Sequence, residues 1–183
     1  TPNGLESISI APTNGSSIFD LAGNGAEATQ AVSSATIKDK TLPTLSFNPQ
    51  NESKNVARSS NMVITASESI RKVVPSHFGN YEINDQNIDT LITLSYDNPN
   101  GAPIAFDAKI SADKKIITVD PVLNFKFGST IFISLTGFED FGGNLPSQST
   151  SASFDVIENV KPVAIAQNVE LNEDDSLSIL LSG

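Results

Sequence analysis

The sequence predicts an all-β protein that folds as an antiparallel two-sheet sandwich. β-branched residues are frequent, apolar and polar residues alternate in short runs, and Gly, Pro, Asn and Asp clusters separate these runs. No segment shows a 3.6-residue apolar period over helical length. The strongest helix candidate, Ser67–Val74, is cut short by Pro75. Seven or eight short strands at this spacing favour a sandwich.

Residues 41–158 contain enough strands for one complete sandwich. Alternation is clearest in Lys115–Val119 and Ser129–Leu135, where one set of apolar side chains is expected to face the core. In chain order, the expected strands are Thr44–Phe47, Asn61–Ala66, Tyr81–Ile83, Thr90–Tyr96, Ile104–Ile110, Lys115–Val119, Thr130–Thr136 and Ser151–Ile157.

The flanking residues predict two incomplete modules. Residues 1–40 offer the strand-like segments Leu5–Ile10, Ser17–Leu21 and Ala31–Ile37, which are too few for a separate core. We expect them to be the C-terminal strands of an upstream module. Residues 159–183, which contain an acidic turn at Asn172–Asp175, are expected to be the first strands of a third module.

Composition excludes several classes of function. With 38% hydrophobic and 17% charged residues, the chain can form a core and is unlike a disordered protein. A net charge of −10 argues against binding to nucleic acid, because phosphate recognition requires clustered Lys and Arg. The absence of Cys excludes a thiol nucleophile and Cys-ligated zinc. No run approaches the roughly 18 apolar residues of a membrane span.

A five-residue motif, Asp-x-x-Gly-Asn, occurs at Asp20–Asn24 and again at Asp140–Asn144. The offset is 140 − 20 = 120 residues, which indicates tandem modules. One interpretation is a tight turn, in which Gly takes a positive φ and Asp caps backbone amides. The other is a calcium site. Calcium is the one cofactor that the sequence leaves open.

Topology favours a particular set of calcium ligands. In an antiparallel sandwich, the turns after the second strand and before the last strand return to the end where the preceding link arrives. The side chains expected there offer the oxygen ligands that calcium prefers. These candidate metal ligands are Asp39, Glu68, Asp140 and Asn144, with Glu139 as a further carboxylate.

Several segments occur in an order that resembles the bacterial Ig-like modules of S-layer proteins and surface adhesins. They are Pro49 with Asn51–Val56, Asn61–Glu68, Lys115–Pro121, Gly128–Ile133 and Asp140–Asn144. The segment Lys161–Ala164 with Asn172–Asp174 resembles the start of a cadherin-like bacterial repeat. These resemblances imply an Ig-like sandwich in a surface-exposed, non-catalytic array.

The expected function is a non-catalytic extracellular repeat segment of a large bacterial surface protein or adhesin, which acts as a spacer or cell-adhesion module. Its expected partners are neighbouring repeats. One alternative is a module that binds a cell-surface glycan or protein through the loops Val73–Tyr81 and Asn98–Pro103. Another is an accessory domain of a secreted hydrolase. No catalytic residues are expected, because His77 is the only histidine and no Gly-x-Ser-x-Gly motif surrounds a serine.

Overall fold

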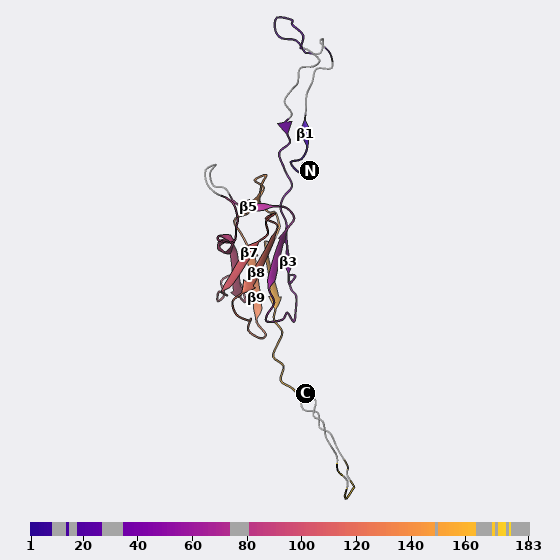
Figure 1. Cartoon of the computed structure of the whole chain (residues 1–183), viewed down its shortest axis with the longest axis vertical. Helices are drawn as coiled ribbons and strands as arrows, with labels where there is room; N and C mark the ends of the chain where they lie inside the picture. The colour runs from indigo at the N-terminus through magenta and orange to yellow at the C-terminus, as the bar shows by residue number, and fades with distance from the viewer. Residues whose placement is uncertain are drawn as a thin grey trace.

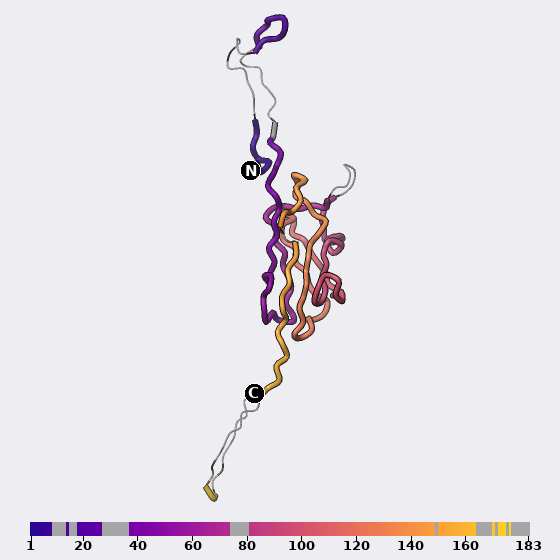
Figure 2. Tube along the Cα trace, turned by 180° about the vertical axis from the view of Figure 1, so that it is seen from behind, coloured from indigo at the N-terminus to yellow at the C-terminus, as the bar shows by residue number. Residues whose placement is uncertain are grey.

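The computed structural model describes residues 1–8, 14, 18–26, 35–73, 81–148, 150–163, 170, 172–174 and 176. A β-sandwich occupies the middle of the chain (Figure 1). The pair β1 (Ser7–Ile8) and β2 (Ala35–Thr36) lies beyond one end of this sandwich, and residues 157–163 leave from the other end (Figure 2). Among the described residues, no helix is long and apolar enough to cross a membrane. Most of residues 159–183, where the first strands of a third module are expected, fall outside the described residues.

Two antiparallel sheets form the sandwich. The first has the order β3-β4-β8-β7, and the second has the order β11-β9-β6. Their bounds are β3 (Leu45–Asn48), β4 (Met62–Ala66), β8 (Ile116–Pro121), β7 (Phe106–Ile110), β11 (Ser151–Asp155), β9 (Thr130–Leu135) and β6 (Ile92–Tyr96). This four-plus-three strand order is that of an immunoglobulin constant-type sandwich. The predicted all-β, Ig-like antiparallel sandwich is therefore confirmed.

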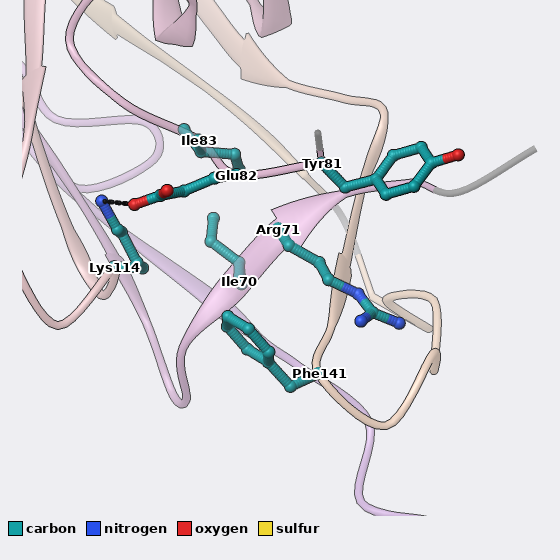
Figure 3. Close-up of a pocket in the computed structure, with 7 residues that line it drawn as sticks. All are labelled: Ile70, Arg71, Tyr81, Glu82, Ile83, Lys114 and Phe141. Carbon is teal, nitrogen blue, oxygen red and sulfur yellow. Dashed lines mark ion pairs between the residues drawn. The ribbon is translucent and has the colours of Figure 1, made fainter. Parts of the chain in front are cut away.

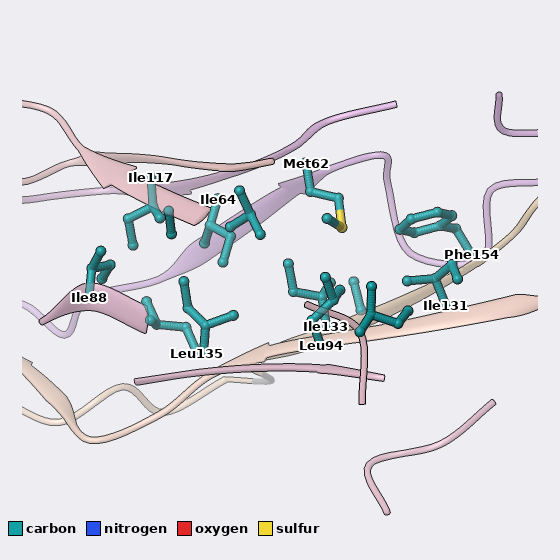
Figure 4. Packing of buried hydrophobic residues seen from close by; sticks show 14 of the residues in the cluster. Met62, Ile64, Ile88, Leu94, Ile117, Ile131, Ile133, Leu135 and Phe154 are labelled. Atoms are coloured by element: carbon teal, nitrogen blue, oxygen red, sulfur yellow. The ribbon is translucent and has the colours of Figure 1, made fainter. Parts of the chain in front are cut away.

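The core lies between the two sheets, where the alternating apolar residues meet (Figure 4). In β8, for example, Ile117 and Val119 are buried while Ile116 and Thr118 face outward. Each fully buried Ile, Leu or Phe side chain contributes about 1.5–3 kcal/mol through removal of apolar surface from water. The largest are Phe125, Phe138, Phe154, Met62, Ile64, Ile70, Ile83, Ile88, Ile117, Ile131, Ile133 and Leu135.

One helix candidate and two expected strands differ from the observed structure. The described part of Ser67–Val74 is not helical but contains β5 (Ile70–Lys72), because Ile70 is buried in the core and pairs with Asp140 of β10 (Phe138–Asp140). Tyr81–Ile83 is irregular, although Ile83 is buried.

The strand expected at Thr90–Tyr96 begins instead as a 3-10 helix, η1 (Ile88–Leu91), and continues as β6. Burial of Ile88 anchors this turn against the core. The remaining predicted strands of the sandwich agree with the observed ones to within two residues at each end.

The N-terminal segment runs beside the residues that lead into the sandwich. The Ile37 amide donates to the Glu6 carbonyl at 2.8 Å, and the Lys40 amide donates to the Pro2 carbonyl at 2.9 Å. The chain then enters β3 directly. The link between the two parts, Lys38–Pro43, therefore lies at the end of the sandwich that carries β5 and β10.

Candidate functional site

Three separate stretches converge where the link meets the sandwich. Asp39 belongs to the link, Glu68 follows β4, and Asp140 ends β10. One carboxylate oxygen from each residue lies within 4.8 Å of the other two. Asp140 is fully buried, and the other two are half-buried. The strand order produces this convergence, because it returns both turns to the end where the link arrives.

The segment Asp140–Asn144, here called the joint turn, is closed by its own side chains. The carboxylate of Asp140 accepts the Asn144 backbone N–H on Oδ1 and the Asn144 Nδ2 on Oδ2, both at 2.8 Å. Gly143 has a φ of 80°, a left-handed conformation that favours glycine. Both oxygens of this buried carboxylate are thus hydrogen-bonded inside the turn.

The first copy of the motif has the same internal hydrogen bonds. Asp20 accepts the Asn24 backbone N–H and the Asn24 Nδ2, again at 2.8 Å each, and Gly23 has a φ of 88°. The side-chain hydrogen bond from Asn24 is the largest cause that lowers the pKa of the exposed Asp20. The motif therefore forms the same turn twice, and side-chain hydrogen bonds close it each time. This agrees with the interpretation of the sequence as a tight turn with a positive φ at Gly and an Asp cap.

In the second copy, the asparagine also holds the link. Nδ2 of Asn144 donates to the carbonyl oxygen of Asp39 at 3.2 Å and to that of Thr41 at 3.1 Å. The link is further shaped by the Thr41 backbone N–H, which donates to Asp39 Oδ1 at 2.8 Å. One carboxamide thus attaches the joint turn to two carbonyls more than 100 residues earlier in the chain.

Gly142 lets the link lie directly on the joint turn. A Cβ atom at this position would be 2.9 Å from the Cβ of Asp39 and 2.9 Å from Nδ2 of Asn144. Such distances are shorter than a van der Waals contact between these atoms. Glycine at this position is therefore required by the close approach of the link.

The carboxylates create an electrostatic conflict at Glu68. Burial is the main cause that raises the pKa of Glu68, followed by the negative charges of Asp140 and Asp39, whereas Lys115 opposes the shift. Glu68 Oε1 is buried and has no hydrogen-bond partner within the described part of the chain. Hard divalent cations prefer oxygen ligands, and this unsatisfied carboxylate oxygen beside two further carboxylates is a ligand of that kind.

The site has room for additional ligands. A groove of about 650 Å³ is lined by Asp39 and Glu68, and Asn3, Leu5 and Thr41 are among its other lining residues. Calcium takes six to eight oxygen ligands, so water would have to complete its coordination here. These residues fit a hydrated cation, whose binding stays a prediction.

Two of the expected ligands have other contacts. The amide group of Asn144 is directed to Asp140 and to the link carbonyls. Glu139 is buried and forms an ion pair with Arg71, with 3.0 Å between Nε and Oε1. Its neighbour Asp140 lies on the opposite side of the strand, so Glu139 does not join the three clustered carboxylates.

A second cavity, of about 380 Å³, lies near the same end of the sandwich (Figure 3). Arg71 extends between Tyr81 and Phe141, and an ion pair of 3.0 Å joins Lys114 to Glu82 at the rim. The lining residues are Ile70, Arg71, Tyr81, Glu82, Ile83, Lys114 and Phe141.

Two loops are expected to form one ligand-binding surface, and their described residues lie at opposite ends of the sandwich. Tyr81 contacts β5 at the joint end, through its carbonyl and the Lys72 amide. The loop Asn98–Pro103 follows Tyr96, which pairs with Ile131 at the far end. Tyr81 and Asn98–Pro103 therefore do not share one surface, while residues 74–80 of the first loop lie outside the described part of the chain. His77 lies outside the described residues.

Comparisons with known proteins place this fold in a family. Residues 39–156 match the family described as the bacterial Ig-like domain. No curated protein matches the chain. Among solved structures, the N-terminal part of the bacterial S-layer protein SbsC is similar over 66% of this chain and 24% of its own, with a TM-score of 0.41 and 12% identity. The LD transpeptidase LdtMt1, solved in complex with imipenem, is similar over 64% of this chain and 41% of its own, with a TM-score of 0.36 and 13% identity.

The chain thus spans less than half the length of either of these solved proteins. The family match, by contrast, includes every strand of the two main sheets, as well as Asp39, Glu68 and the joint turn. By this match, the chain belongs to the bacterial Ig-like domain family.

Proposed function

We propose that this chain is a non-catalytic segment of a large extracellular bacterial surface protein, in which the sandwich acts as a spacer with a stiffened joint. Bacterial Ig-like domains are generally non-catalytic modules, which supports the first part of the proposal. The second part depends on one observation, the hydrogen bonds from Asn144 to the link.

The attachment of the link limits motion between the sandwich and the residues that precede it. A free link of this length would sample many backbone conformations, and each residue that is fixed loses about 1–2 kcal/mol of conformational entropy. The two bonds from Asn144 and the packing on Gly142 offset this loss at Asp39 and Thr41. In this proposal the partners are neighbouring modules of the same protein.

A calcium ion bound by Asp39, Glu68 and Asp140 would strengthen the same joint. Two like charges about 4 Å apart repel by roughly 1 kcal/mol in water and by more near a protein surface. A divalent cation would replace this repulsion with attraction and would tie the link to two turns of the sandwich. The unpartnered Oε1 of Glu68 supports this part of the proposal.

Thermal unfolding and small-angle X-ray scattering of the 183-residue chain test the calcium proposal. In millimolar calcium, compared with EDTA, we expect a higher melting temperature and a narrower distribution of maximum dimensions. Asp39→Asn should lose most of this response while it retains the fold. An unchanged melting curve would exclude the metal but would leave the hydrogen-bonded joint intact as a proposal.

The cavity near Tyr81 supports a second candidate function, which is recognition of a cell-surface glycan or protein. Its floor contains the buried Ile70 and Ile83, and its rim carries the rings of Tyr81 and Phe141 with Arg71 between them. Aromatic rings and a guanidinium are groups that contact sugars or peptides. A glycan array without signal above background would count against the glycan as a ligand.

A further inference from the structure

Three of the four outer edges of the two main sheets are covered within the described part of the chain. Residues 51–56 form a short parallel segment along the edge of β11, with backbone bonds that include Glu52 to Ser153. Residues 102–104 run antiparallel along the edge of β6. Covered edges cannot pair with another strand, because their backbone groups already have partners.

The edge of β7 is covered in another way. The backbone N–H of Ala108 donates to Asp89 Oδ1 at 3.1 Å, and that of Ile110 donates to Asp85 Oδ1 at 2.9 Å. The exposed Asp107 adds a further charge to this strand. Carboxylates therefore occupy the backbone donors of Ala108 and Ile110 that an added strand would need.

The edge of β3 is open. Ala66 lies opposite Leu45 but donates its N–H to Lys115 on the other side, so Leu45 occupies a position without hydrogen bonds to β4. Phe47, two residues further, has the same orientation. Within the described residues, no hydrogen bond engages the backbone N–H or C=O of Leu45 or Phe47.

A neutral groove of about 340 Å³ lies beside this open edge. Its lining contains no ionisable side chain, although the chain carries a net charge of −10. The lining residues are Leu45, Ser46, Phe47, Gln50, Asn51, Gln148 and Ser151. A second copy of this acidic chain could therefore approach β3 without contact between carboxylates.

We propose that β3 is an interaction surface for β3 of a second copy, paired antiparallel about a two-fold axis at Ser46. Leu45 of each copy would then exchange both backbone hydrogen bonds with Phe47 of the other. These four bonds would satisfy all the open backbone groups of both residues. The side chain of Ser46 is exposed and small, so it leaves space for the two strands at the axis.

This arrangement has a defined orientation. Because the paired strands are antiparallel, the two chains point in opposite directions. Such contacts join molecules that extend from facing surfaces rather than neighbours on one surface. Four hydrogen bonds form a small contact, so we expect association that depends strongly on protein concentration.

A cysteine substitution provides a direct test, because the chain contains no other cysteine. At the two-fold axis, the Cα atoms of position 46 would be about 4.5 Å apart, which lies within the range for a disulfide. Under mild oxidation, Ser46→Cys should form linked dimers faster than Asp107→Cys, an exposed control on the charged β7 edge. Equal rates for the two variants would overturn the proposal.

Sedimentation analysis gives a second, non-covalent measurement. The average mass of the unmodified chain should rise with concentration, whereas Ser46→Lys should remain monomeric, because two like charges would face each other at the axis. Asn48→Lys, on the same exposed face but away from the axis, should associate more than Ser46→Lys does. A monomer at all concentrations would overturn the proposal, even if another protein's strand bound to β3. The measurements are made in EDTA, so their failure is independent of the calcium proposal.

Discussion

Replacement of Asn144 by alanine tests whether the joint turn holds the link. The substitution removes the bonds from Nδ2 to the carbonyls of Asp39 and Thr41, at 3.2 and 3.1 Å. Nδ2 carries two hydrogens and Asp140 accepts one of them, so the two link carbonyls share the other. With about 1 kcal/mol for this net hydrogen bond, the link loses about 1 kcal/mol of attachment. Because 1.4 kcal/mol is a factor of ten in an equilibrium constant, the link should be open about fivefold more often.

Limited trypsin digestion measures this opening, because Lys40 lies within the link. When opening and closing are faster than cleavage, the cleavage rate follows the population of the open form. We therefore expect cleavage after Lys40 to accelerate by about fivefold in Asn144→Ala. Asn24→Ala serves as the matched control, since it removes the same amide from a turn with no described bond to the link.

The same substitution also removes the bond to the buried Asp140 at 2.8 Å. A hydrogen bond to a charged group contributes about 2 kcal/mol, which lowers the melting temperature of a sandwich of this size by about 8 °C. If Lys40 were cleaved at the same rate in the variant and the parent, with both folded by circular dichroism, the attachment of the link by Asn144 would be refuted.

Two further substitutions probe the same joint. Gly142→Ala would place a methyl group 2.9 Å from the Cβ of Asp39, so the link must move and cleavage after Lys40 should increase; an unchanged rate would contradict the packing argument. Glu68→Gln tests the raised pKa of Glu68. The Glu68 carboxyl binds its proton more tightly in the folded protein than in the unfolded chain. The stability that this carboxyl contributes is therefore fully present below its ordinary pKa of 4.5 and is lost as pH rises through the folded pKa. Glu68→Gln should remove this loss and raise the melting temperature at neutral pH in EDTA. A profile of stability against pH that matches the parent would contradict this reasoning.

The sequence predicts the strands of the sandwich where alternation is strong. In β8, the buried Ile117 and Val119 alternate with the outward-facing Thr118 and Asp120, so the period of two is visible. β10 could not be found in this way, because its sequence is Phe-Glu-Asp and all three residues are buried. Its acids are stable there only through partners elsewhere in the chain, Arg71 for Glu139 and Asn144 for Asp140.

β5 was missed for a related reason. With three residues, it is too short to show a period, and its pairing with β10 depends on the folded sandwich. The neighbouring apolar and charged residues instead resemble the start of a helix. Tertiary pairing decides the structure of such short segments.

At the site, strand order predicts the place of three of the four expected ligands, but it does not predict the contacts of the fourth, Asn144. Strand order alone brings Asp39, Glu68 and Asp140 to one end, and the structure gathers them there. The hydrogen bonds of Asn144 to the link could not be derived, because they depend on the path of a segment more than 100 residues earlier. The sequence does contain one indication of these bonds. Asn24 occupies the same place in the first turn, and a repeated asparagine indicates that its side-chain amide forms a specific hydrogen bond.

The glycine beneath the link also distinguishes the two turns. Ala22 stands in the first turn where Gly142 stands in the second, while the hydrogen bonds from Asn to Asp are the same. A methyl group at the position of Gly142, like that of Ala22 in the first turn, would lie 2.9 Å from the Cβ of Asp39. A preceding segment therefore could not approach the first turn as closely as the link approaches Gly142. In a protein with many such modules, a single methyl group would decide which joints are stiff and which bend, so a pattern of alanine and glycine could encode the shape of the whole molecule.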